Sequence, residues 1–157
     1  MILYLDLSGY SDIAIAFGRL CGFIVPENFK KPWRAASFTV FWRSWHATLG
    51  DWIREHVFIM LMNKKLNRIK SAVVAIITMM VMSLWHGFYF SYLLSGLYTG
   101  FLLGLENLLG LTSPKKNKNI VKVLRCIAVN FLFGINALVF ITGFSNALAI
   151  AAGLFKL

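Results

Sequence analysis

The stretch SAVVAIITMMVMSLWHGFYFSYLL (residues 71–94) decides the fold class, because it is long, apolar and free of Lys, Arg, Asp and Glu. A helix needs roughly 20 mainly apolar residues to cross a bilayer. The stretch therefore predicts a membrane-spanning helix, with His86 late in the span. The apolar run Gly96–Leu111 follows almost at once and can return as a shorter, tilted helix. We expect residues 71–111 to form a helical hairpin.

The remaining chain predicts further helices and no strands. Met1–Val25 is a first helical candidate that Pro26 ends. The segment Ser37–Met62 is too polar to cross hydrocarbon unaided, so re-entrant or amphipathic helices are expected there, with the Ser37 side chain as an N-cap. One more span is expected within residues 120–155, centred on residues 129–144. The sequence thus predicts an all-α, polytopic transmembrane protein with a single membrane domain over residues 1–157.

Composition and charge support a membrane protein. The chain is 59% hydrophobic and only 14% charged, whereas soluble domains carry roughly 45–50% apolar and about 25% charged residues. The formal net charge is +10. Nine basic residues lie between Lys30 and Lys70, and five lie between Lys115 and Arg125. These blocks flank apolar runs, so we place both on the cytoplasmic side, against anionic lipid headgroups rather than nucleic acid. Within the first of these two blocks, residues 63–70 are expected to form a basic loop.

The beginning of the chain has no basic n-region and carries Asp6 and Asp12 inside its apolar stretch. It reads as the middle of a membrane helix, so we expect a chain that begins partway through a larger protein. The two cysteines, Cys21 and Cys126, have neither metal-like spacing nor a disulfide framework. Glycine-rich phosphate loops, nucleophile elbows and zinc-helix motifs are absent from the sequence. No metal and no bound cofactor are expected.

Two histidines are the strongest candidates for chemistry. His86 follows Trp85 in a membrane helix, where a titratable side chain is costly and therefore suggests function. A histidine bonded between helices, with Trp85 as an interfacial anchor, is an equally good interpretation. His46 follows Trp45 and Arg43, and it suggests either a catalytic imidazole near the membrane surface or an aromatic belt with a snorkelling arginine.

The charged residues Asp51, Arg54 and Glu55 are spaced three and four apart along a helix. At this spacing their side chains share one face. An ion pair that fixes a half-buried segment is the favoured interpretation, in preference to catalysis.

Taken together, several stretches resemble the membrane-bound O-acyltransferase family, in its bacterial teichoic-acid D-alanylation and alginate acetylation branch. Their order and approximate spacing match as well. The resemblance covers essentially the whole chain, but only the C-terminal part of the family fold. The stretches are Tyr4–Asp12, Pro26–Phe29, Phe41-Trp-Arg-Ser-Trp-His46 continuing to Leu49 and Trp52–Arg54, and Trp85-His86-Gly87.

The resemblance implies many helices around a transmembrane tunnel in a bacterial plasma membrane. A thioester donor, either a phosphopantetheine carrier protein or coenzyme A, would bring a D-alanyl or acetyl group from the cytoplasm. Hydroxyls of a cell-envelope polymer, presented by acceptor machinery, would receive it. By motif, His86 is implied as the general base and His46 as the residue that positions or polarises. Trp85, Trp45 and Arg43 are implied as substrate-positioning residues.

The sequence departs from the family pattern in three places. It has Thr48-Leu49-Gly50 where members often have Ser-Leu-Ser, and Arg54-Glu55-His56 where Arg-Asp-Tyr is common. It also lacks the Leu-Gly-Gly stretch that follows in alginate-type members. The basic continuation at residues 60–65 favours the D-alanyl-transfer type.

Two other hypotheses remain open from the sequence. The chain could be an inactive truncated membrane remnant or a non-catalytic subunit, because four or so spans are too few to enclose a tunnel. A small channel or ion-coupled transporter rests on Asp6, Asp12 and His86 alone, and we rank it last.

Overall fold

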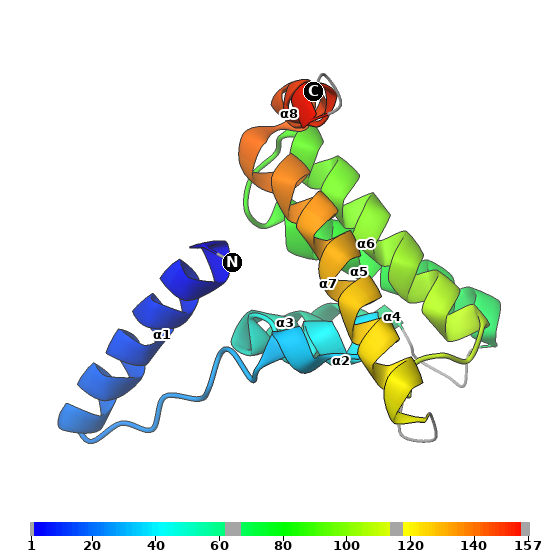
Figure 1. Cartoon of the computed structure of the whole chain (residues 1–157). Helices are drawn as coiled ribbons and strands as arrows, with labels where there is room; N and C mark the ends of the chain where they lie inside the picture. The colour runs from blue at the N-terminus through cyan, green and yellow to red at the C-terminus, as the bar shows by residue number, and fades with distance from the viewer. Residues whose placement is uncertain (1, 62–66, 114–117, 155–157) are drawn as a thin grey trace.

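The structure is a computed structural model, and it describes residues 2–61, 67–113 and 118–154. Within these ranges the chain is helical and contains no strand, which confirms the all-α class. Figure 1 shows the arrangement. The α-helices are α1 (Ile2–Leu20), α2 (Phe38–Trp42), α3 (Ala47–Ile53), α4 (Ile59–Leu61), α5 (Arg68–Leu84), α6 (Phe90–Leu108), α7 (Asn119–Thr142) and α8 (Phe144–Leu154).

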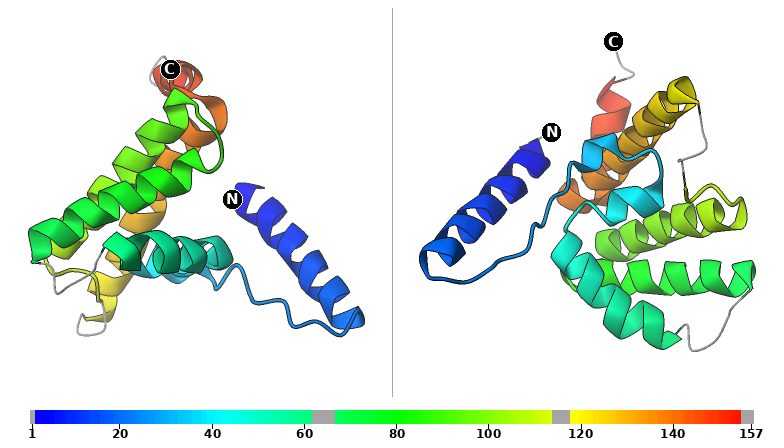
Figure 2. Two further views of the ribbon diagram at one scale, coloured as in Figure 1. Left: turned by 180° about the vertical axis from the view of Figure 1, so that it is seen from behind. Right: turned by 90° about the horizontal axis from the view of Figure 1, so that it is seen from below.

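Most of helix α1 stands apart from the other helices and is joined to them by an extended segment (Figures 1 and 2). Its first turn is in contact with the rest of the chain through Tyr4, whose ring lies 4.9 Å from that of Trp33. It ends at Leu20, five residues before the expected Val25, because a turn at Cys21 and Gly22 stops it. Gly22 has φ +80, a left-handed conformation that glycine adopts without steric cost. Most apolar side chains of α1, such as Phe17, are exposed.

The N-terminus of α2 is held by two side chains. The Ser37 hydroxyl accepts a hydrogen bond from the Val40 N–H, which confirms Ser37 as the N-cap. The Glu106 carboxylate of α6 accepts the backbone N–H groups of Phe38 at 2.9 Å and Thr39 at 2.8 Å. Arg125 of α7 lies 3.8 Å from the same carboxylate. A buried charge is stable only when it is paired and hydrogen-bonded, so Glu106 joins α2, α6 and α7.

The segment expected to hold re-entrant or amphipathic helices is a chain of short helices. After α2 and α3, a π-helical turn at Arg54–Phe58 leads directly into α4. Arg54 pairs with Asp51 at 3.6 Å and with Glu55 at 3.7 Å, as the spacing predicts. All three side chains are about half exposed, so each pair contributes little to stability.

Helices α5 and α6 form the expected hairpin, but the predicted single span over residues 71–94 is wrong. Helix α5 ends at Leu84, and the chain reverses before α6 begins at Phe90. The Gly87 N–H donates to the Leu84 carbonyl at 3.1 Å, and Gly87 itself has φ +148. Window-averaged hydropathy does not detect this reversal, because the turn is short and apolar helices flank it on both sides. His86 therefore lies in a turn rather than within a span.

Three glycines let α6 approach α5 closely. A Cβ atom at Gly100 would lie 2.6 Å from the Ile76 Cα, and one at Gly96 would lie 2.8 Å from the Met80 Cα. Gly104 is less tightly packed. Small residues at every fourth position are typical of close helix packing in membranes.

At the start of α5, Asn67 caps the helix, so residues 68–70 of the expected basic loop are helical, whereas residues 63–66 lie outside the described residues.

Helix α7 is the described helix that is long and apolar enough to cross a membrane, with a mean hydropathy of 2.0 over its most apolar window. It includes most of the span expected over residues 129–144. Only 11% of that window is buried inside the protein. The other described helices do not meet the same criteria, so the polytopic arrangement stays a prediction. Helix α8 follows after Gly143 and crosses the end of the hairpin (Figure 1).

Candidate functional site

The two histidines that the sequence singles out meet in space. His46 lies in the turn between α2 and α3, and His86 lies in the turn between α5 and α6. Their ring centroids are 6.5 Å apart. Even with two ring nitrogens turned toward each other, the nitrogens would be about 4 Å apart, beyond hydrogen-bond range. A single oxygen atom placed to one side of the line that joins the two nitrogens can therefore hydrogen-bond to both imidazoles.

The backbone at His46 is held in an unfavourable conformation. His46 has φ +49 and ψ +50, in the left-handed region that residues with a side chain rarely adopt. Asn28 holds the residues that follow His46: its backbone carbonyl accepts the Ala47 N–H at 2.8 Å, and its side-chain oxygen accepts the Thr48 N–H at 3.2 Å. The His46 Nδ1 atom lies 3.2 Å from the same side-chain oxygen. Strain of this kind persists only where the surroundings over-determine it.

His86 lies among aromatic rings. The ring of Trp85 meets it edge-on at a centroid distance of 5.1 Å, and Phe140 of α7 does so at 5.2 Å. Tyr92 of α6 lies farther away at 6.4 Å. The His86 side chain itself is exposed. This ring is thus flanked by apolar surface and open to an incoming molecule.

Partial desolvation by the neighbouring side chains favours the neutral form of both imidazoles. Desolvation lowers the pKa of His46 below its usual 6.5, and the nearby His86 lowers that pKa further. Desolvation also lowers the pKa of His86. Both rings lie in turns, outside the helix that is long enough to span a membrane. A neutral imidazole can accept a proton, so the pair is suited to general base chemistry near pH 7.

The two candidate tryptophans differ in their surroundings. Trp45 is 8% exposed and lies stacked on Phe41 at 5.7 Å, in the aromatic core beneath the His46 turn. The ring of Phe133 from α7 lies 4.7 Å from it. Trp85, by contrast, is 63% exposed and touches His86. The structure therefore gives Trp45 a supporting position and leaves Trp85 accessible to a substrate.

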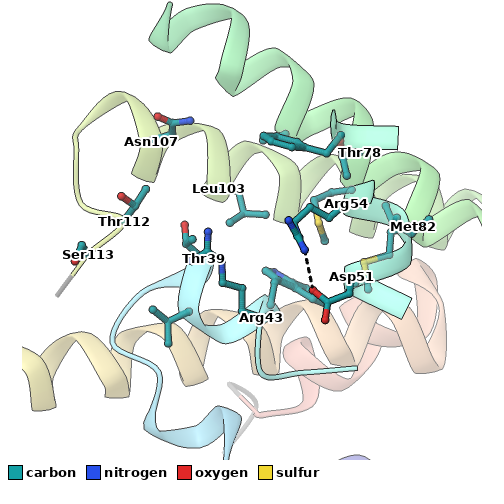
Figure 3. Close-up of a pocket in the computed structure, with 17 residues that line it drawn as sticks. Thr39, Arg43, Asp51, Arg54, Thr78, Met82, Leu103, Asn107, Thr112 and Ser113 are labelled. Carbon is teal, nitrogen blue, oxygen red and sulfur yellow. Dashed lines mark ion pairs between the residues drawn. The ribbon is translucent and has the colours of Figure 1, made fainter. Parts of the chain in front are cut away.

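Arg43 does not join the histidines but lines a separate pocket of about 700 Å³ (Figure 3). Arg54 and Asp51 form an ion pair at its edge, and Thr39 and Asn107 add polar groups. Its other walls are largely apolar side chains from α3, α5 and α6. Neither His46 nor His86 lines this pocket. Within the described residues, the pocket lined by Arg43 and Arg54 is therefore separate from the pair formed by His46 and His86.

Sequence reasoning missed two residues that organise the site. Asn28 lies in the quoted stretch Pro26–Phe29, but its contacts with His46 depend on chain folding that no spacing reveals. Glu106 was not singled out, although an acidic residue in an apolar helix is itself a signal of a buried partner. Among the described residues, no three His, Cys, Asp or Glu side chains are grouped so as to hold a metal ion.

Comparison with known proteins identifies the family. Residues 1–148 match the membrane-bound O-acyltransferase family, and the chain belongs to it. It is a family of membrane proteins, so the chain is placed in a membrane. This finding agrees with the helical fold and with the stretches that carry both histidines.

Three relatives illustrate the range of the family. The probable alginate O-acetylase AlgI of Pseudomonas putida is 40% identical over 120 residues, which cover 76% of this chain and 25% of that protein. The peptidoglycan O-acetyltransferase of Helicobacter pylori is 32% identical, over 83% of this chain and 25% of that protein. The teichoic acid D-alanyltransferase of Streptococcus thermophilus is 41% identical, over 62% and 25%. The chain thus spans about a quarter of the length of these relatives.

Proposed function

We propose that this protein transfers an acyl group from a thioester to hydroxyl groups of a cell-envelope polymer. The observation that carries the proposal is the histidine pair, whose rings lie 6.5 Å apart in two separate turns. Two neutral imidazoles that one oxygen atom can contact at the same time are suited to the deprotonation of a hydroxyl. The relatives named as O-acetyl- and D-alanyltransferases support the same class of reaction.

In the proposed reaction the hydroxyl oxygen attacks the thioester carbonyl carbon. The proton of the hydroxyl passes to an imidazole of the pair, while a new carbon–oxygen bond forms. The carbon–sulfur bond then breaks, and the thiolate leaves with a proton from an imidazole. The products are an ester and a free thiol, and the pair returns to its starting protonation. General base assistance of this kind contributes about 10²–10⁴-fold to the rate.

The donor side of the proposal rests on the pocket beside Arg43. Its apolar walls suit an acyl chain or a pantetheine arm, and Arg43 and Arg54 suit a phosphate group. A phosphopantetheine carrier protein or coenzyme A is therefore the proposed donor.

The acyl group of the proposed reaction is acetyl or D-alanyl, because the relatives include proteins named for each transfer. The lack of the Leu-Gly-Gly stretch of alginate-type members favours D-alanyl.

We further propose a multi-pass arrangement in a bacterial plasma membrane, in which α7 crosses the bilayer and the α5–α6 hairpin is embedded beside it. Exposed apolar side chains on α1 and α7, such as Phe17 and Phe131, support contact with lipid. In a cysteine-free background, cysteines introduced at Ser113 and Asn146 should react with an impermeant reagent from opposite sides. Labelling of both from one side would contradict a span by α7.

The activity is tested with bacterial membranes that carry the native protein. These membranes are incubated with envelope polymer and with acetyl or D-alanyl thioester, each labelled in the acyl group. Alkali-labile label on the polymer, absent from membranes of a deletion strain, is the expected result. Equal labelling with and without the protein would favour the alternative, an inactive remnant or a non-catalytic subunit.

A further inference from the structure

We infer that Asn28 is a positioning residue, which holds His46 with its proton on Nδ1 and leaves Nε2 as a proton acceptor. This inference deepens the proposed function and rests on it for its catalytic meaning. The hydrogen bonds that Asn28 makes to the His46 ring and to the two residues that follow it carry the inference.

Three groups converge on the Asn28 side-chain oxygen. The Thr48 hydroxyl lies 2.8 Å from it, and the Thr48 N–H and the His46 Nδ1 atom each lie 3.2 Å from it. The Asn28 backbone carbonyl also accepts the Ala47 N–H. One residue thus contacts three consecutive positions: the ring of His46, the backbone of Ala47, and the backbone and hydroxyl of Thr48.

The donor and acceptor roles follow from the Thr48 backbone. An amide N–H can only donate, so the Asn28 atom facing it must be the carboxamide oxygen and not the nitrogen. That oxygen can only accept, so the His46 Nδ1 atom that faces it must carry a hydrogen. In a neutral imidazole the other nitrogen, Nε2, is then an acceptor. Asn28 thereby selects one of the two tautomers of His46.

This tautomer indicates which histidine of the pair accepts the proton of the hydroxyl. A hydroxyl has one proton to give, and His46 offers a fixed acceptor for it. His86 makes no side-chain hydrogen bond to the described residues, so either of its tautomers is available to donate to the same oxygen. The geometry gives the first proton transfer to His46, whereas the family motif had implied His86.

The first test measures the tautomer directly, with no need for activity. The full-length protein, labelled with 15N-histidine and held in detergent micelles, is observed by two-bond proton–nitrogen correlation. The His46 signals are identified by their loss in His46→Gln. The inference expects the hydrogen on Nδ1 in the wild type and a mixture of tautomers in Asn28→Leu, which removes the acceptor. A hydrogen on Nε2 in the wild type would overturn it.

The second test uses the pH profile of transfer, and Asn28→Asp is the informative variant. Aspartate retains the acceptor oxygen and adds a negative charge beside His46, so the pKa of the imidazole rises. The acid limb of the kcat/KM profile should move to higher pH, with activity above that limb retained. Asn28→Leu should lose about 10²-fold in kcat/KM, the low end of what general base assistance contributes. An acid limb that stays at the wild-type pH in Asn28→Asp would contradict the inference.

Thr48→Val is the matched control, because it removes a hydrogen bond to the same Asn28 oxygen without touching the imidazole. Its tautomer and its acid limb should match those of the wild type, and a shift in either would contradict the inference. The proposed function and the role of Asn28 can be rejected independently of each other. Absence of transfer by the wild type, together with the expected tautomer, would reject the proposed function and support the role of Asn28.

Discussion

The Glu106 carboxylate accepts hydrogen bonds from both the backbone N–H and the hydroxyl of Thr39, at 2.8 and 2.7 Å. The two residues belong to α6 and α2, so this contact fixes the short helix that precedes the His46 turn. Arg125 of α7 completes the arrangement. A single buried carboxylate therefore sets the position of the site relative to the hairpin and to α7.

Replacing Glu106 with alanine should lower the free energy of unfolding by about 3–5 kcal/mol, because the charge of Arg125 and two backbone donors lose their partner. The measurement is thermal unfolding in detergent, followed by tryptophan fluorescence. Glu55→Ala is the control, since Glu55 pairs with Arg54 at the surface and should cost about 1 kcal/mol or less. Equal losses for the two variants would show that Glu106 does not join the helices.

Gly100→Ala should separate α5 from α6, because the added Cβ would lie 2.6 Å from the backbone of Ile76. Overpacking typically costs about 1–3 kcal/mol. Gly104→Ala should cost less, since its Cβ would lie 3.3 Å from Ala72. Gly134→Ala on α7 meets open space and should leave stability unchanged or slightly higher. The same unfolding measurement ranks the three variants, and a different order would contradict this packing.

The two tryptophans should respond differently to truncation. Trp45→Ala removes a buried ring from the aromatic core and should cost about 3–5 kcal/mol of stability. Trp85→Ala removes an exposed ring and should leave the unfolding temperature nearly unchanged while lowering the rate of acyl transfer. Measured side by side, the two variants distinguish a tryptophan that supports the fold from one that contacts the substrate. A large loss of stability in Trp85→Ala would refute its accessible position.

Much of the fold was predictable from local signals. Ser37 was recognised as an N-cap because hydroxyl capping depends on neighbouring residues alone. The ion pair of Asp51 with Arg54 followed from helical spacing. The hairpin was predicted as well, but its turn was placed too late, because hydropathy averaged over a helix-length window does not register a short turn around Gly87 between two apolar helices.

The two histidines of the site were predictable from the sequence, but the residues that hold them in place were not. His86 stands out because titratable residues are rare in apolar segments, and His46 because it follows Trp45 and Arg43 in the Phe41–His46 stretch. The contacts of Asn28 with His46, and of Glu106 with α2, join residues far apart in the sequence. No periodicity or spacing reports such contacts, so they required the three-dimensional structure. Trp45 and Trp85 likewise look alike in sequence, and only burial separates them.

The measurement that tests the central claim most directly is the content of O-linked acyl esters in the cell envelope. It compares His46→Ala, His86→Ala and His56→Ala at equal protein level in the native membrane. His56 is the control, because its ring stacks on Trp52 at 4.5 Å and lies outside the pair. The account predicts that ester content falls to that of the deletion strain in the first two variants and stays at the wild-type value in His56→Ala. Wild-type ester content in both His46→Ala and His86→Ala would contradict it.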